Sequence, residues 1–432
     1  MRAKSTKAIY NSRGKGLTGE LTVPGDKSIS HRGLLLGSLA EGRTKIENLA
    51  PGEDVRSTVT CLQALGVPLG ERENQFVVEG QGLKGFSEPE GSLDAGNSGT
   101  LTRLMAGVLA TYPFISEIDG DDSLRSRPME RIIEPLEAMG ARIDSREGRL
   151  PLLVNGGDLK GIKYRPEVAS AQVKSSILLA GLGALGETVV LEPGPSRDHT
   201  ERMLKAMGYP IQVDKNRITV SGPHKLDPLE LEVPGDFSSA CYFIAAACLV
   251  DGSELTIKDV GLNETRTGFL ELLNSMGASI QTTNYEERNG EPRGDLVVSQ
   301  SNLTGISLTE DQVVKSIDEL PLLAVAATQA EGVTEVRGAE ELRVKETDRI
   351  KATVSNLRNL GADIEELPDG FIVRGRSKLS GSRVESFKDH RIAMSTAVAA
   401  LVAEGETELV EPEWVEISYP SFFETMEELL DD

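Results

Sequence analysis

Two short stretches decide how this chain folds, LTVPGDKS at 21–28 and LEVPGDFS at 231–238. Each has the pattern of a β-strand, a Pro-Gly turn and an Asp that opens a helix, and Pro and Gly favour fixed turns. We expect the chain to cross between two domains at these turns, at Pro24-Gly25 and again at Pro234-Gly235. This predicts a discontinuous domain of residues 1–24 plus 235–432 and an inserted domain of residues 25–234, with the functional site in the cleft between them.

A repeated unit extends outward from these stretches along the whole chain. Six polar or acidic openings precede helices rich in Ala, Leu, Ile and Val, namely DKSIS (26–30), GNSGT (96–100), SAQVK (170–174), DFSSA (236–240), DELPL (318–322) and KDHRI (388–392). A second, amphipathic helix follows each, and five of these end on similar phrases that contain Gly66, Gly140, Gly208, Gly277 and Gly361. The glycine steps of 74, 68, 69 and 84 residues indicate a repeated supersecondary unit.

The pattern within each unit predicts an α/β architecture with the helices inside. The first helices are apolar on most sides and should be buried; they are expected at 28–40, 101–110, 173–184, 240–250, 321–330 and 392–403. Intervening runs such as TKIENL and ELTIKDV alternate like half-buried strands. We expect sheets to surround the helices. The acidic end EELLDD at 427–432 is expected to be a solvated tail.

Composition limits the class of partner. The 432 residues carry a net charge of −22, which argues against nucleic acid and anionic membranes as partners. The three cysteines have neither metal-site spacing nor a disulfide framework, and four scattered histidines make a histidine metal site improbable. Residues 1–20 contain no apolar targeting segment, and no apolar stretch approaches the length of a membrane span. We therefore expect a cytoplasmic protein.

The cations at the helix starts point to an anionic ligand. Helix N-termini attract anions through unpaired N–H groups and the helix dipole. The need to cap a helix explains any single polar opening. Six openings in register, most of them with a cation, instead favour helix starts that converge on one ligand with more than one phosphate or carboxylate. These cations are Lys27, Arg32, Arg103, Arg127, Lys174, Arg197, Lys345, Arg349 and Arg391.

Two acidic residues among the cations are candidates for acid/base chemistry, Asp318 and Glu346. A helix cap remains an alternative for Asp318, as does a salt-bridged helix surface for 342–350. The stretch before Ser28 is not a nucleotide-binding P-loop, because it lacks the earlier glycine that this loop requires. Gly99 lies in a loop whose backbone N–H groups can approach a phosphate closely.

In combination, four motifs resemble one enzyme family. GDKSISHR (25–32), GNSGT (96–100), RVKETDR (343–349) and DHR (389–391) are similar to the 5-enolpyruvylshikimate-3-phosphate synthases, or 3-phosphoshikimate 1-carboxyvinyltransferases, and the similarity covers nearly the whole chain. The resemblance implies a two-domain inside-out α/β barrel, each domain formed by three βαβαββ repeats with buried helices. It also implies no metal or organic cofactor, and we expect a monomer.

The resemblance further implies a reaction in the shikimate pathway to chorismate and the aromatic amino acids. The enolpyruvyl group of phosphoenolpyruvate moves to the 5-hydroxyl of shikimate 3-phosphate through a tetrahedral intermediate, and phosphate is released. By the same resemblance, phosphoenolpyruvate is held by Lys27, Gly99, Arg127, Gln172, Arg349 and Arg391. Shikimate 3-phosphate is held by Lys27, Ser28, Arg32, Ser170, Gln172, Arg197, Asp318 and Lys345.

The resemblance assigns the proton transfers to three residues. Asp318 would accept the proton of the 5-hydroxyl, and Glu346, with Lys27, would handle the proton that enters and leaves the methylene. For Glu346 to act as an acid, burial on domain closure must raise its pKa.

The chain departs from the family pattern at three positions. Ala171 stands where many members have a second Ser, Glu341 where some have Asn, and Ile417 where some have a phosphate-contacting Lys.

Two other functions remain open. One alternative is the related enzyme that acts on UDP-N-acetylglucosamine, which usually carries a reactive Cys in a loop; the corresponding segment here, 119–128, has none. The other is a non-catalytic anion-binding repeat protein.

Overall fold

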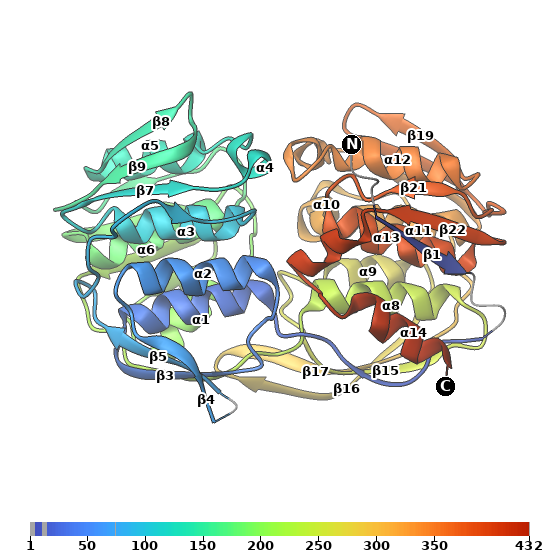
Figure 1. Ribbon diagram of the computed structural model, residues 1–432, viewed down its shortest axis with the longest axis horizontal. Coiled ribbons are helices and arrows are strands. Elements are labelled where there is room, and N and C mark those ends of the chain that lie inside the picture. Colours follow the sequence, from blue (N-terminus) through green and yellow to red (C-terminus); the bar gives the residue numbers. More distant parts are fainter. Residues whose placement is uncertain (1–4, 11–14, 74, 432) are drawn as a thin grey trace. The chain divides into compact units, whose positions relative to one another are not determined.

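The computed structural model describes residues 5–10, 15–73 and 75–431 (Figure 1). The chain divides into two compact units. We call residues 1–24, 234–286 and 292–432 the split unit, and residues 25–233 and 287–291 the inserted unit. The predicted absence of a targeting segment concerns 1–20, of which 1–4 and 11–14 lie outside the described residues.

The inserted unit consists of three small mixed sheets and seven helices among the described residues. The sheet orders are β14-β3-β5-β4, β6-β7-β9-β8 and β10-β11-β13-β12. Its helices are α1 (Lys27–Leu39), α2 (Glu53–Ala64), α3 (Gly99–Leu109), α4 (Asp122–Arg125), α5 (Glu130–Met139), α6 (Ala171–Gly183) and α7 (His199–Ala206). Its strands are β3 (Glu41–Glu47), β4 (Leu69–Arg72), β5 (Gln75–Gln81), β6 (Leu93–Asp94), β7 (Ile115–Asp119), β8 (Arg142–Arg146), β9 (Arg149–Asn155), β10 (Lys163–Tyr164), β11 (Gly186–Leu191), β12 (Gln212–Asp214), β13 (Arg217–Gly222) and β14 (Glu230–Glu232).

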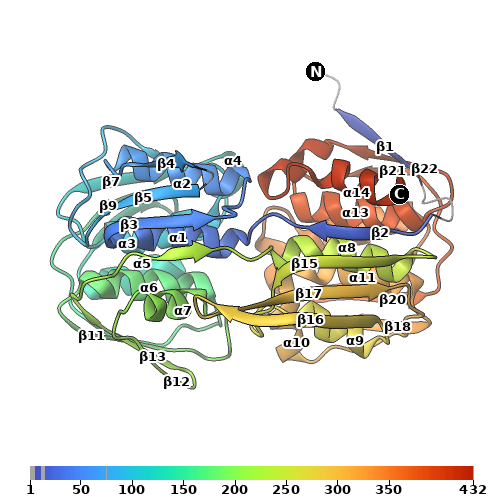
Figure 2. The ribbon, with the colours of Figure 1, turned by 90° about the horizontal axis from the view of Figure 1, so that it is seen from below.

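The split unit repeats this arrangement. Its sheet orders are β16-β17-β15-β2, β18-β20-β19 and β1-β22-β21, and Figure 2 shows β2, β15, β17 and β16 side by side. Its helices are α8 (Phe237–Leu249), α9 (Gly268–Ser275), α10 (Glu310–Ser316), η1 (Ile317–Glu319), α11 (Leu320–Gln329), η2 (Glu340–Val344), α12 (Arg349–Asn359), α13 (His390–Val402), η3 (Pro412–Ile417) and α14 (Phe422–Asp431). Its strands are β1 (Thr6–Tyr10), β2 (Thr18–Thr22), β15 (Glu254–Gly261), β16 (Ser279–Arg288), β17 (Glu291–Ser299), β18 (Gly332–Val336), β19 (Asp363–Leu367), β20 (Gly370–Gly375), β21 (Arg383–Glu385) and β22 (Glu406–Val410).

The two Pro-Gly stretches place each strand in the unit opposite to the helix that follows it. β2 pairs in parallel with β15 of the split unit, whereas α1, the next helix, belongs to the inserted unit. Likewise β14 pairs in parallel with β3 of the inserted unit, and α8 follows in the split unit. A side chain at Gly25 would collide with the carbonyl oxygen of Asn48, only 1.8 Å from the added Cβ, so glycine is required at this turn.

The boundaries differ from the predicted ones in two details. Pro234 belongs to the split unit, and residues 287–291 belong to the inserted unit. The second difference arises because the tip of the β16–β17 hairpin bonds to inserted-unit residues. Arg202 Nη1 donates to the Gly290 carbonyl at 2.7 Å, and His199 Nδ1 lies 2.7 Å from Glu291 Oε1. The sequence pattern gave no sign of these contacts.

Burial of the six apolar helices is confirmed. In α1, α3, α6, α8, α11 and α13 nearly every residue after the first turn is buried, and each unit has its own apolar core. The glycines of the repeated phrases lie just after the second helices with positive φ, for example 112° at Gly140 and 92° at Gly361. This left-handed conformation ends a helix and favours glycine, which explains the repeated phrase.

The prediction of a solvated tail is wrong for the described part of the acidic end. Residues 422–431 form α14, and Leu429 on it is 6% exposed. The helix begins at Phe422. The centroid of its ring lies within 6 Å of the ring centroids of Tyr242, Phe243 and Tyr419. Apolar residues spaced along a short helix therefore anchor an end whose charges alone suggested solvation.

Candidate functional site

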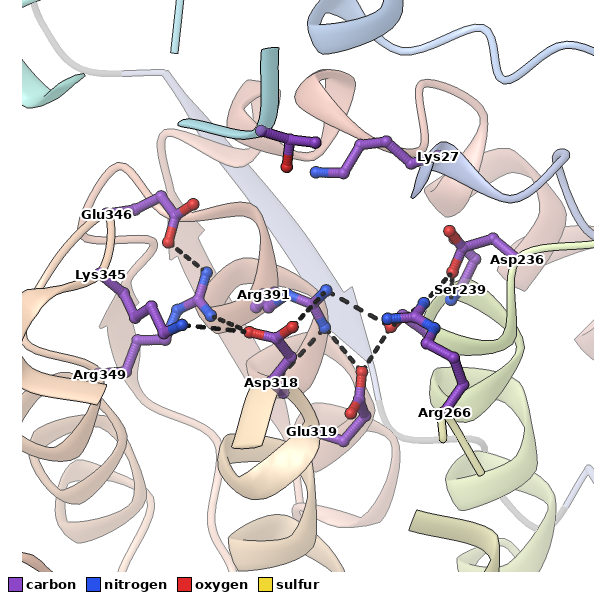
Figure 3. A network of polar contacts seen from close by, with 12 residues as sticks. Lys27, Asp236, Ser239, Arg266, Asp318, Glu319, Lys345, Glu346, Arg349 and Arg391 are labelled. Carbon is purple, nitrogen blue, oxygen red and sulfur yellow. Dashed lines mark hydrogen bonds and ion pairs between the residues drawn. The ribbon is translucent and has the colours of Figure 1, made fainter. Parts of the chain in front are cut away.

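Buried arginines and carboxylates form a continuous network in the split unit (Figure 3). Arg349, the first residue of α12, is 1% exposed and lies among three carboxylates. Its Nε donates to Asp389 Oδ2 at 2.7 Å, its Nη2 to Glu346 Oε2 at 2.6 Å, and its Nη1 to Asp318 Oδ1 at 3.4 Å. Burial acts to lower the pKa of Arg349, but Asp389, Glu346 and Asp318 outweigh it and raise that pKa.

Asp318 occupies the centre of three cations. Besides Arg349, its carboxylate lies 3.9 Å from Lys345 Nζ and 3.8 Å from Arg391 Nη2. Asp318 lies in the 3-10 turn η1, and the N-cap residue of α11 is Glu319, which makes no side-chain cap hydrogen bond. The alternative that Asp318 caps the helix is therefore wrong, and its carboxylate faces the cations instead. Among the six openings, DELPL differs because this extra turn precedes its helix.

Arg391 lies at the start of α13, where its position opposes the helix dipole. Asp389 caps this helix by accepting hydrogen bonds from the backbone of Arg391 and Ile392. The Arg391 guanidinium donates to Glu319 Oε1 at 3.0 Å, to the Asp318 carbonyl at 3.2 Å and to Ser238 Oγ at 3.4 Å. Carboxylates thus help to offset the unfavourable position of this arginine.

In the inserted unit, the first turn of α1 presents Lys27 and Ser28. Asp26 caps the helix by accepting from Ile29 N at 2.8 Å, as its position in the opening predicts. Lys27 Nζ donates to Asp54 Oδ2 at 2.8 Å, and the Lys27 side chain is 21% exposed. The amine is therefore half-buried but still accessible to a ligand.

Arg32 is buried among uncharged oxygens one turn further along α1. It donates to Thr200 Oγ1 at 2.7 Å, Ser175 Oγ at 2.9 Å and the Ser28 carbonyl at 2.9 Å. Burial lowers the pKa of Arg32 to about 10, although the nearby Glu201 and Asp26 oppose that effect. Hydroxyl and carbonyl partners position the guanidinium without cancelling its charge.

Gly99 begins α3 beside two arginines. A Cβ added at Gly99 would lie 2.8 Å from Arg103 Nη1 and 3.3 Å from Arg127 Nη1, so a larger residue would displace both. Arg103 donates to Gln172 Oε1 at 2.7 Å, and Arg127 donates to Asn97 Oδ1 at 2.7 Å. The glycine, both arginines and Gln172 therefore lie together in the inserted unit.

The predicted cations near α6 and α7 divide into two kinds. Ser170 caps α6 by accepting from Val173 N at 3.4 Å, and Arg197 is half-buried before α7. Lys174, in contrast, is 1% exposed and its Nζ lies 3.1 Å from Glu192 Oε2 and 2.6 Å from Glu201 Oε1. Lys174 is therefore a buried structural ion pair, and the prediction that it faces an anionic ligand is wrong.

Several residues of these clusters were missed by sequence reasoning. They are Asp54, Asn97, Ser175 and Thr200 in the inserted unit and Ser238, Arg266, Glu319 and Asp389 in the split unit. Asn97, Ser238, Glu319 and Asp389 lie within the helix openings that the sequence did reveal, so their positions could have been suspected. Arg266 lies in a loop outside every motif and carries no sequence signal.

Further observations concern two of the departures from the family pattern, metal ligands and membrane-spanning helices. Ile417 is 5% exposed and buried, and Ala171 is the first residue of α6. Within the described ranges, no group of three or more His, Cys, Asp or Glu side chains could hold a metal ion. Also within those ranges, every helix is too short or too polar to cross a membrane.

Comparison with solved structures defines the class. An EPSP synthase from Acinetobacter baumannii superposes with a TM-score of 0.88 at 43% identity, covering 98% of both chains. The enolpyruvyl transferase NikO from Streptomyces tendae superposes with a TM-score of 0.78 at 17% identity, covering 99% of this chain and 98% of its own, which shows a shared fold alone. The structure is a mixed α/β fold of the enolpyruvyl transferase class, with several small mixed sheets.

Sequence comparison defines the family within that class. The chain is 48% identical over 416 residues to a 3-phosphoshikimate 1-carboxyvinyltransferase of Bacillus cereus (strain B4264), covering 96% of this chain and 97% of the relative. The enzyme of the same name from Bacillus thuringiensis (strain Al Hakam) is 47% identical over the same shares. The family model for EPSP synthase (3-phosphoshikimate 1-carboxyvinyltransferase) matches residues 12–426. The chain belongs to the EPSP synthase family.

Proposed function

We propose that this chain catalyses the reaction for which its family is named, 3-phosphoshikimate 1-carboxyvinyl transfer. The 5-hydroxyl oxygen of shikimate 3-phosphate adds to C2 of phosphoenolpyruvate while a proton enters the methylene carbon, which gives the tetrahedral intermediate. The bond from C2 to the phosphate oxygen then breaks and the methyl group loses a proton. The products are 5-enolpyruvylshikimate 3-phosphate and phosphate. Nearly full-length similarity to the relatives of that name supports the proposal.

One observation carries the mechanism, namely the position of Asp318 among three cations. Its carboxylate lies 3.4 to 3.9 Å from Arg349, Lys345 and Arg391 and does not cap a helix. A general base must be ionised, and nearby cations favour the charged carboxylate. We assign Asp318 to accept the proton of the 5-hydroxyl as the new C–O bond forms.

Glu346 is assigned to the methylene proton. Its Oε2 accepts from Arg349 Nη2 at 2.6 Å, which fixes the carboxylate beside the same guanidinium that contacts Asp318. One carboxylate can deliver a proton to the methylene in the addition step and remove one from the methyl group in the elimination step. Lys27, half-buried at the start of α1, is the second candidate for this transfer.

Binding of the two anions is divided among the remaining residues. For shikimate 3-phosphate we assign Lys27, Ser28, Arg32, Ser170, Gln172, Arg197, Asp318 and Lys345; for phosphoenolpyruvate, Lys27, Gly99, Arg127, Gln172, Arg349 and Arg391. The uncharged partners of Arg32 support its assignment, because they leave a full positive charge for a phosphate. The reaction requires residues of both units, and we propose that it is accompanied by domain closure.

A finer description of the fold accompanies this proposal. We infer that each unit is an inside-out α/β barrel of three βαβαββ repeats. The orders β14-β3-β5-β4, β6-β7-β9-β8, β10-β11-β13-β12 and β2-β15-β17-β16 support the repeat, because each pairs its first strand in parallel with its second. A monomeric state and a cytoplasmic location also stay proposals.

A coupled-substrate assay tests the function. Purified protein should release phosphate from phosphoenolpyruvate only when shikimate 3-phosphate is added, and mass spectrometry should detect the enolpyruvyl product. Release that depends on UDP-N-acetylglucosamine instead would transfer the assignment to the related enzyme. Absence of release with either acceptor, together with measurable binding of both anions, would favour the non-catalytic binding protein.

A further inference from the structure

Three buried polar side chains surround Arg391, and none of them has been assigned a role above. Ser238 lies in the first turn of α8, Arg266 in the loop between β15 and α9, and Glu319 in η1. Their exposed fractions are 6%, 4% and 4%. Figure 3 shows Arg266 and Glu319 directed toward Arg391 from separate elements of the split unit. Polar groups buried this deeply need partners, and these three contact one another, Arg391 and Asp236.

The Ser238 hydroxyl is the centre of this group. Its Oγ donates to Glu319 Oε1 at 2.5 Å and accepts from Arg266 Nη2 at 2.9 Å and from Arg391 Nη2 at 3.4 Å. A hydroxyl has one hydrogen and two lone pairs, and an arginine can only donate. Both arginines must therefore occupy the lone pairs, so the hydrogen must point to Glu319. All hydrogen-bonding capacity of Ser238 is used, which fixes its rotamer.

Charge balance within the group explains why it tolerates burial. Arg391 Nη1 donates to Glu319 Oε1 at 3.0 Å, and Arg266 Nη2 lies 3.5 Å from Asp236 Oδ1. Each buried guanidinium group thus has a buried carboxylate partner within this group, and Arg391 also lies 3.8 Å from Asp318, so both positive charges are compensated. Glu319 also contacts Arg391 and Ser238 through the same oxygen, which couples the orientation of the arginine to that of the hydroxyl.

We propose that Ser238, Arg266 and Glu319 are positioning residues that orient the Arg391 guanidinium for the phosphoenolpyruvate anion. This inference rests on the proposed function, which assigns Arg391 to that substrate. Helix formation does not require the Ser238 hydroxyl, because Asp236 caps α8 by accepting from Ser239 N at 3.0 Å. Loss of the hydroxyl should therefore affect the arginine more than the helix.

Steady-state kinetics with Ser238→Ala test the inference. We expect the KM for phosphoenolpyruvate to rise about tenfold, the loss typical of a hydrogen bond to a charged group, with a change of less than about twofold in the KM for shikimate 3-phosphate. Ser239→Ala is the matched control, since it removes the same atom from the next residue of α8, which is 5% exposed. Ser238→Thr retains the hydroxyl and should restore most of the affinity.

A second variant keeps the test independent of folding defects. Glu319→Gln preserves the shape of the side chain and removes its charge, and it should raise the same KM while circular dichroism and the unfolding midpoint verify the fold. Equal effects of Ser238→Ala and Ser239→Ala on every kinetic constant, with active wild-type protein, would overturn the positioning role and leave the proposed function intact. Wild-type protein without shikimate 3-phosphate-dependent phosphate release would overturn both.

Discussion

Arg349 and Arg391 in the split unit have a different kind of partner from Arg32 in the inserted unit. In the split unit, Arg349 and Arg391 donate to the carboxylates of Asp389, Glu346 and Glu319. In the inserted unit, Arg32 donates to hydroxyl and carbonyl oxygens. Carboxylate partners cancel positive charge and add groups that can exchange protons, whereas neutral partners preserve positive charge for a ligand. Under the proposed function, the acidic partners of Arg349 and Arg391 bring carboxylates beside the reacting groups, whereas the neutral partners of Arg32 leave its charge for a phosphate.

Removal of the Asp318 carboxylate should have the largest effect, because it tests the catalytic side of this comparison. We expect Asp318→Asn to lower kcat by about 10²- to 10⁴-fold, the range for loss of a general base, with a smaller change in KM. Phosphate release at saturating substrates measures it. The control is Asp363→Asn, which alters a 67% exposed carboxylate paired with Arg374. Turnover close to wild type would exclude Asp318 from catalysis.

The next effect concerns Lys174, a fully buried cation of the inserted unit that has two carboxylate partners. Lys174→Met leaves Glu192 and Glu201 buried without their cation, and breaking such a pair costs about 3–5 kcal/mol of unfolding free energy. Denaturant unfolding measures this loss. Lys378→Met, which breaks an exposed pair with Glu404, should cost less than about 1 kcal/mol. Similar losses in the two variants would contradict a structural role for the buried triad.

A moderate effect is expected at Gly99, where the inserted unit positions its arginines. Gly99→Ala places a methyl group 2.8 Å from Arg103 Nη1, and the flexible end of that side chain can move away. The fold should tolerate the change, while the KM for phosphoenolpyruvate should rise about tenfold, equivalent to about 1.4 kcal/mol of binding. Gly70→Ala, where no atom lies within 4 Å of the added carbon, is the control. An unchanged KM would separate Gly99 from the binding site.

The smallest effect is the pH dependence of shikimate 3-phosphate binding. The pKa of Arg32 is lowered to about 10, so this side chain is charged below that pH and loses its proton above it. The contribution of Arg32 to phosphate affinity should be constant near neutral pH and fall about twofold as the pH reaches 10, with steeper loss beyond. Isothermal titration calorimetry across this range measures it. The same curve from Arg32→Gln protein should lack this step; identical curves would contradict the assignment.

The sequence predicted structure correctly where one continuous segment determines whether a helix forms, is buried and ends. The six buried helices follow from apolar residues on all sides, and the repeated glycines follow from the left-handed turn that ends a helix. The helix openings also suggested that Gly99, Arg103 and Arg127 lie near a common site, whereas Gln172 was expected there only from the family resemblance.

Prediction from the sequence failed where the outcome depends on which distant side chains meet. Lys174 resembles the other helix-start cations in sequence, yet it pairs with Glu192, which follows β11, and with Glu201 on α7. Arg266 carries no signal, because its importance arises only from contact with Ser238 in another element. The helix at 422–431 was missed because the prediction considered only the acidic residues of this end. It overlooked the aromatic residue Phe422, which packs against the split unit.

The exchange of β2 and β14 at the Pro-Gly turns has a consequence for how the gene can be divided. In the split unit, Asp236 N donates to the Pro24 carbonyl at 2.8 Å, so the two points where this unit is interrupted are immediate neighbours. In the inserted unit, Val233 N donates to the Glu47 carbonyl at 3.1 Å, and Val233 Cγ1 lies 3.1 Å from a Cβ built at Gly25, so the start and finish of this segment also adjoin. Excision of residues 25–233 would therefore join Pro24 to Pro234 across a short gap, with residues 287–291 as the one remaining inserted-unit segment in the split-unit gene.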